Sequence, residues 1–353
     1  MRLQLIALAL VACAAARAHA DTTFAAKTQV YADSDHTTVV SPAVEASADV
    51  APTTNVSLGY LVDIVSSASV DVVTQASKEM HDQRHQVSTG LAQIFGALTI
   101  SGSYSFSREN DYLSHTFGVT ATRDFDDKNT TLSLGYGASL NTVGRANDDN
   151  FSRSLTVQHV AATWTQVFSP ATIGQLTYEL EYADGYQASP YRFVPVRLSV
   201  DAAPEFWVPE TDPETRYRHS FVVGVNHALG DDSVQADYRF YTDTWGITSH
   251  TVGARYFKKL GKKAELRLRE RFYTQGAATF YENVYTQAEQ FMAYDRELSP
   301  LWSETVGAKL TYRLAPHVEG ELKCDVFYYS YSDFAPLASR TGTNTGIGVS
   351  LLY

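Results

Sequence analysis

The sequence predicts an all-β protein, a transmembrane antiparallel up-and-down β-barrel of about 16 strands, with 14 to 18 as the range. Composition is the first observation, because charged residues make up only 19% and there are 22 Tyr among abundant Thr, Val and Ser. Such residues favour strands. The second is a long-range alternation of apolar and polar residues. The third is that the connections between the alternating runs are by turns short and long.

Composition excludes several other classes of protein. The net charge of −11 argues against a nucleic-acid partner. No apolar run of about 18 residues follows position 20, as a membrane-spanning helix would need. Cys13 and Cys324 are too few for a disulfide framework or a zinc site.

Residues 1–20 are expected to be a signal peptide. A basic start precedes an apolar run from Leu3 to Ala16, and Ala18-His19-Ala20 forms a cleavage site. An alternative is a lipid-modified Cys13 after Leu10-Val11-Ala12. With cleavage near Ala20, residues 21–353 form one barrel domain. We expect it in the outer membrane of a Gram-negative bacterium, in contact with lipid and lipopolysaccharide.

The alternating runs justify the strands one by one. In residues 98–107, Leu, Ile, Gly, Tyr and Phe alternate with Thr and Ser. Such runs last about 10 to 15 residues, whereas soluble strands average about 5 or 6. Tyr gathers near strand ends, as in an aromatic girdle. Sixteen runs begin near residues 23, 37, 54, 83, 97, 113, 130, 153, 171, 217, 233, 247, 263, 302, 317 and 344.

The connections predict how the barrel is oriented. Joints after even-numbered runs are tight and carry Gly, Pro, Asp or Asn, as at Ser169-Pro170 and Gly230-Asp231-Asp232. Joints after odd-numbered runs are often long. Outer-membrane barrels have short periplasmic turns and long extracellular loops, so both termini are expected in the periplasm. The long joints are residues 67–82, 142–152, 186–216, 276–301 and 332–343.

Three segments fit this pattern poorly. The apolar phase changes between Leu155–Val157 and Val160, which predicts a bulge near His159. Glu270 falls on the lipid face, so either it lies near a rim or the assigned register is wrong there. Residues 67–82 have the spacing of a short helix.

The last strand carries a candidate assembly signal. Alternating apolar residues end in a C-terminal aromatic, which resembles the signal read by the barrel-assembly machinery. Its residues are Ile347, Val349, Leu351 and Tyr353.

Several stretches resemble one bacterial protein family. They are YRFYTDTWGITSHTVGARYF from Tyr238, RLRERFYTQGAATFY from Arg267, DIVSSASVDVVTQAS from Asp63, and SPYR from Ser189. Together they resemble the domain-of-unknown-function family numbered 3570, over nearly the whole mature chain. The resemblance implies an outer-membrane barrel. It implies no activity, substrate or catalytic residue.

The polar faces of the strands predict the lining of the lumen. Residues 54–141 contribute mostly Ser, Thr, Gly and Asn, and later strands contribute charges. Basic and acidic stripes facing each other would screen solutes by charge. The alternative is that neighbouring charges pair and fill the wall. The candidate lumen residues are Glu179, Glu181, Asp237, Arg239, Asp243, Arg255, Glu265, Arg267, Arg269, Arg271, Lys309, Arg313, Glu319, Glu321, Lys323 and Asp325.

No catalytic, metal or cofactor site is expected. Asp243, Ser249 and His250 suggest a triad, but Ser249 and His250 are adjacent and point to opposite faces of an extended strand. The aromatic, proline-rich loop 186–216 is expected either to fold inward as a constriction or to lie across the mouth. The loop 276–301, with its aromatics and carboxylates, is expected either to pack on its neighbours or to bind sugars or cations.

Together these features favour a porin-like channel for passive passage of small polar solutes or ions. One alternative is a sealed barrel that acts as a scaffold or sleeve for a periplasmic or surface partner. The other is an outer-membrane hydrolase with a site at the rim.

Overall fold

The computed structural model describes residues 22–69, 80–199 and 201–353, which form a closed antiparallel barrel of sixteen strands. The predicted signal peptide at residues 1–20 lies outside these residues, as do positions 70–79 of the predicted helix. Each barrel strand pairs with its neighbours in sequence, and β1 closes on β18. The first eight barrel strands are β1 (Thr22–Asp33), β2 (Thr37–Ala51), β3 (Thr54–Ser67), β4 (Met80–Phe95), β5 (Leu98–Arg108), β6 (Tyr112–Phe125), β7 (Thr130–Val143) and β8 (Arg153–Ser169).

A small hairpin interrupts the second half of the barrel. It consists of β10 (Phe193–Arg197) and β11 (Pro204–Pro209), and lies in the connection between β9 and β12. Two 3-10 turns, η1 (Asp126–Lys128) and η2 (Arg296–Leu298), lie in described connections. The other barrel strands are β9 (Thr172–Gly185), β12 (Thr215–Leu229), β13 (Asp232–Asp243), β14 (Thr248–Leu260), β15 (Ala264–Gln275), β16 (Leu301–Ala315), β17 (Val318–Tyr331) and β18 (Ser339–Leu352).

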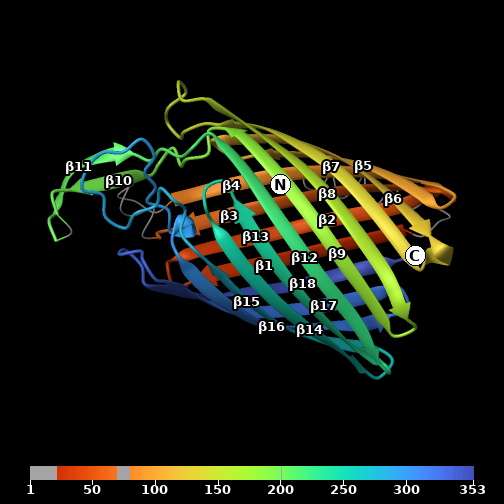
Figure 1. Cartoon of the computed structure of the whole chain (residues 1–353). Helices are drawn as coiled ribbons and strands as arrows, with labels where there is room; N and C mark the ends of the chain where they lie inside the picture. The colour runs from red at the N-terminus through yellow and green to blue at the C-terminus, as the bar shows by residue number, and fades with distance from the viewer. Residues whose placement is uncertain (1–21, 70–79, 200) are drawn as a thin grey trace.

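The two ends of the barrel differ, as the connections predicted. Figure 1 shows the β10–β11 hairpin and the long connections beyond one end, which we call the long-loop end. Tight connections, such as Phe95 to Leu98 and Leu229 to Asp232, lie at the short-turn end. Gly96 and Gly230 have positive φ there, which glycine adopts without steric strain.

The bulge predicted near His159 is wrong. His159 pairs with Gly137 on one side and Glu181 on the other, without a register shift. The apolar phase changes because Leu155 and Val157 point inward and line a cavity. The register around Glu270 is also regular, with Ala254 and Val306 as its partners, and the side chain is exposed on the outer face.

The outer face carries a repeated polar pair, which we call the Tyr–His belt. In β13 and β14, Tyr238 faces Val252, Phe240 faces His250, and the Tyr238 hydroxyl lies 2.7 Å from His250 Nδ1. The same diagonal contact occurs in four further pairs of neighbouring strands, and in one of them Gln158 takes the place of His. The five pairs are Tyr60–His85, Tyr104–His115, Tyr136–Gln158, Tyr178–His219 and Tyr238–His250.

A second polar row lies eight residues further along each of the same strands. Between the two rows the outward residues are mainly apolar, as with Val252, Ala254 and Tyr256 in β14. Eight residues at about 3.4 Å span roughly 27 Å along the strand. A strand tilt of about 40° reduces this to about 21 Å, close to the roughly 25 Å apolar band of membrane barrels. The second row consists of Gln93, Arg123, Gln166, His227 and Lys258.

The next hairpin breaks the belt. Glu270 faces Val306 and Phe272 faces Glu304, so two exposed carboxylates occupy the places of Tyr and His. Glu270 therefore lies at the edge of the apolar band, which agrees with the first of the two explanations that the sequence left open.

Candidate functional site: the barrel lumen and its capped cavity

The inward face of the barrel has two unlike halves. On β3 to β7 it consists largely of short side chains, as in the row Ser57, Gly90, Ser103, Gly118 and Gly137 across five strands. From β9 onward it carries long charged side chains. The sixteen candidate lumen residues all occupy inward positions of their strands, alternating with exposed residues such as Val252 and Leu268. Their role in selecting solutes stays a prediction.

Most of these charges pair with neighbours. On β9 to β14 the pairs are Glu181–Arg218, Glu179–Arg239 at 3.4 Å, and Asp237–Arg255 at 3.2 Å. On β16 and β17 they are Lys309–Glu321 at 3.3 Å, Arg313–Glu319 at 3.6 Å, and Lys323–Asp325 at 2.9 Å. The sequence argument missed Arg218, although Arg216, Arg218 and Ser220 alternate with Tyr217, His219 and Phe221.

The basic stripe of β15 consists of Arg267, Arg269 and Arg271, which differ in whether they form an ion pair. Arg269 reaches across β16 to Asp325, with Nε 3.1 Å from the carboxylate, and Asp325 is buried. The reach needs Gly307 between them, because a Cβ there would overlap the Asp325 carboxylate. Arg267 and Arg271 have no ion-pair partner in the described part of the chain.

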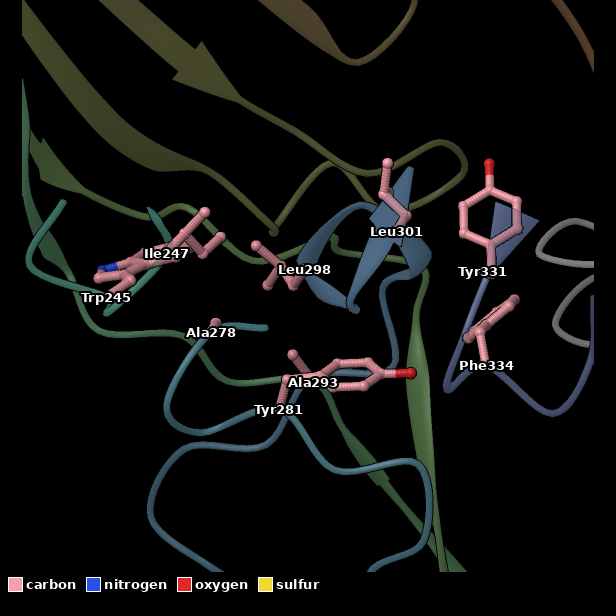
Figure 2. Packing of buried hydrophobic residues seen from close by; sticks show 9 residues of the cluster. All are labelled: Trp245, Ile247, Ala278, Tyr281, Ala293, Leu298, Leu301, Tyr331 and Phe334. Carbon is pink, nitrogen blue, oxygen red and sulfur yellow. The ribbon is translucent and has the colours of Figure 1, made fainter. Parts of the chain in front are cut away.

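The loops at the long-loop end pack into a cap. Trp245, Tyr281, Leu298, Tyr331 and Phe334 belong to one buried apolar cluster (Figure 2), which joins the β13–β14, β15–β16 and β17–β18 connections. A second cluster, of Val194, Val196, Tyr285 and Met292, fixes the β10–β11 hairpin to the 276–300 connection. The 276–301 loop packs on its neighbours, which is one of the two arrangements that the sequence predicted for it.

Beneath the cap lies a cavity of about 650 Å³, which we call the capped cavity. Its wall includes Arg216, whose guanidinium lies 2.5 Å from the buried Asp243 carboxylate and 4.0 Å from the Trp245 ring centroid. Asp243 also accepts backbone hydrogen bonds from Trp245 and Ile247, which holds the β13–β14 turn. Arg271 lines the same cavity, with its guanidinium over the Tyr273 ring.

The loop side of the capped cavity is acidic. Arg192 bridges Glu210 and Asp295, each at 2.9 Å, and burial raises the pKa of Glu210. Asp212 is only 8% exposed, and its Oδ1 has no hydrogen-bond partner. Burial, reinforced by Glu210 and Asp295, raises the pKa of Asp212 to about 8. The Gln187 side-chain oxygen, from the same wall, is also unpartnered.

The trio Asp243, Ser249 and His250 does not form a triad. Ser249 faces inward and lines the capped cavity, whereas His250 faces outward and bonds Tyr238. One group that could hold a metal ion exists in the described regions. It consists of Asp82, Glu109 and Asp111, and the Tyr191 hydroxyl donates to Asp111. The sequence argument expected no metal site.

The candidate assembly signal forms the closing seam of the barrel. Ile347 and Val349 are exposed on the outer face, and the Tyr353 backbone exchanges hydrogen bonds of 2.9 and 3.0 Å with Thr22. Recognition of this strand by an assembly machinery stays a prediction.

The closed barrel, its apolar outer band and its polar lumen define a membrane-spanning β-barrel protein of the outer-membrane type. No helix in the described regions is long and apolar enough to cross a membrane. The chain belongs to the family described as "Protein of unknown function (DUF3570)", which matches residues 74–342.

Solved structures show the same fold at low identity. A bacterial polysaccharide outer membrane secretin is 8% identical with a TM-score of 0.53, over 95% of this chain and 98% of that one. CdiB from Acinetobacter baumannii is 8% identical with a TM-score of 0.52, over 94% and 60%. The siderophore receptor PirA from Acinetobacter baumannii is 11% identical with a TM-score of 0.48, and this chain spans 53% of its length. None of the curated proteins matches the chain.

Proposed function

We propose that this protein is a porin-like channel of the bacterial outer membrane, for passive passage of small polar solutes or ions. The observation that carries the proposal is the short-side-chain half of the lumen wall. Ser and Gly on β3 to β7 are too small to fill a barrel of sixteen strands, which is wide enough for an aqueous path. The long-loop end would then face outward and the short-turn end the periplasm.

The charged half of the wall would set the selectivity. Paired charges largely cancel at a distance. Of the candidate lumen residues, Glu265, Arg267 and Arg271 form no ion pair in the described regions, so in this half of the wall the two cations outweigh the one carboxylate. Both lie on β15, opposite no carboxylate, because their cross-strand neighbours include Lys309 beside Arg267 and Thr305 beside Arg271. The channel should therefore prefer anions.

Single-channel conductance of the refolded protein in a planar bilayer tests this proposal. We expect steady ohmic steps with anion preference, and a shift of the reversal potential towards cation preference in Arg267→Gln/Arg271→Gln. Lys258→Gln is the control, because it removes one positive charge from the outer face, beside Asp232. An equal shift in the control, or none in the double variant, would contradict the selectivity argument.

A sealed barrel that serves as a scaffold for a partner is the second candidate, favoured by the packed loop cap. Absence of conductance from a protein shown to be folded would overturn the channel proposal and support this one. We do not propose a rim hydrolase, because the nucleophile and base that the sequence offered, Ser249 and His250, lie on opposite faces of β14.

A further inference from the structure

Two ionisable side chains of the capped cavity form no ion pair in the described parts of the chain. Asp212 comes from the loop before β12, is 8% exposed and leaves its Oδ1 unpartnered. Arg271 comes from β15, and its guanidinium lies over the Tyr273 ring, 5.3 Å from the ring centroid. Arg218 and Arg239 also line this cavity, but their partners are Glu181 and Glu179.

We propose that the capped cavity binds zwitterionic solutes of the size of an amino acid or short peptide, with the ligand's cation at Asp212 and its carboxylate at Arg271. This inference rests on the proposed channel function, because it names the class of solute that the channel would take up.

Asp212 is buried and Arg271 is half-buried, and a ligand that carries both charges pairs with both side chains at once. A buried polar group without a partner is costly, and a buried charge more so. A simple cation would pair with Asp212 and leave Arg271 alone, and a simple anion would do the reverse. The volume of about 650 Å³ lies within the usual range of small-molecule sites. The Tyr186 and Trp245 rings supply apolar contact for the body of the ligand.

The loop side is built to accept hydrogen bonds from a cation. Gln187, which lines the cavity, donates its amide to the carbonyls of Pro213 and Glu214, and its side-chain oxygen is buried without a partner. Asp212 has a raised pKa, so a bound cation would favour its ionised form and release a proton. The charged groups that act on Asp212 are Glu210, Asp295, Arg192 and Arg216, and Tyr186 lies nearby.

The test uses three probes that differ in charge and little in shape. Nα-acetyl-arginine carries a guanidinium and a carboxylate, both ionised between pH 5 and 9. Its amide lacks the anion, and Nα-acetyl-citrulline lacks the cation. Titration calorimetry of the full-length folded protein in detergent measures the three affinities. We expect the zwitterion to bind at least tenfold more tightly than either control, which is about 1.4 kcal/mol.

Variants assign each charge to its side chain. Asp212→Asn should weaken acetyl-arginine and its amide about tenfold and leave acetyl-citrulline unchanged. Arg271→Gln should weaken acetyl-arginine and acetyl-citrulline and leave the amide unchanged. Asp201→Asn is the matched control, because Asp201 is exposed on the connection between β10 and β11 and should leave all three affinities unchanged.

The pH dependence of the affinity gives a separate test, because misfolding of a variant would not reproduce it. If ionised Asp212 holds the cation, the affinity for acetyl-arginine should rise about 90-fold between pH 6 and pH 9, in step with the ionised fraction of Asp212. In Asp212→Asn that rise should vanish. Equal affinities for the three probes, or unchanged binding in both variants, would overturn the inference. Conductance without binding would leave the channel proposal standing, and binding without conductance would refute the channel and keep the site.

Discussion

Replacing Asp212 by Asn should make the loop cap insensitive to alkaline pH. In the folded protein burial raises the pKa of this carboxyl from 3.8 to about 8. In an opened cap the carboxyl would be exposed to water and return to about 4. Below about pH 4 the carboxyl is protonated in both states, and its ionisation does not lower the stability of the closed cap. As the pH rises the opened state ionises first, so the closed state loses stability until the pH passes about 8.

The size of the effect follows from the shift. Each pKa unit corresponds to about 1.36 kcal/mol. Between pH 6 and pH 9 the closed cap should lose about 3 kcal/mol of free energy relative to the opened state. This corresponds to roughly a 100-fold larger opened population, and Asn, which does not titrate, should abolish it.

Limited proteolysis of the 186–214 connection measures the opened population when closing is faster than cleavage. The ratio of cleavage rates of the wild type and Asp212→Asn, taken at each pH, removes the pH dependence of the protease. We expect this ratio to rise about 100-fold between pH 6 and pH 9, and acetyl-arginine to reverse the rise. A constant ratio would refute the reasoning, as would greater protection of the wild type at alkaline pH.

Three further substitutions test the barrel wall by urea unfolding in lipid vesicles. Gly307→Ala should cost about 1–3 kcal/mol, because its Cβ would overlap the Asp325 carboxylate, whereas Gly102→Ala, with its nearest atom at 3.9 Å, should cost less than 1. Glu270→Leu should stabilise by about 1 kcal/mol if lipid covers it, and a loss would indicate a polar partner. Tyr238→Phe should cost about 1 kcal/mol through the lost bond to His250, and no change would mean that the bond contributes nothing.

Alternation predicted the barrel well because a closed barrel forces one face of every strand towards water and the other towards lipid. The run expected near 302 begins at Leu301, and the one near 344 begins earlier, at Ser339. The same rule failed at Leu155 and Val157, where apolar residues face inward under the cap. Periodicity alone cannot distinguish an apolar residue that contacts lipid from one that lines a cavity.

The capped cavity could not be found from the sequence. Asp212 belongs to a loop and Arg271 to a strand, and the raised pKa of Asp212 comes from its burial and from Glu210 and Asp295 beside it. The sequence placed Arg271 on the inward face but could not separate it from Arg269. Burial and pairing depend on how the loops meet across the barrel, and no local pattern records that.

Whether an arginine of β15 forms an ion pair depends on the residues beside it on the neighbouring strands. Arg269 lies beside Gly307, and the absence of a side chain there lets Asp325 reach over β16 and neutralise it. Arg271 lies beside Thr305 and Gly253, and the Asp237 carboxylate that reaches over Gly253 pairs with Arg255 instead. An unpaired cation near water-filled space acts over about a Debye length, roughly 8 Å at physiological salt, whereas a close ion pair acts over much less. Of the three arginines in this stripe, Arg267 and Arg271 therefore act as two separate cations. Only Arg271 shares a cavity with the unpaired carboxyl of Asp212.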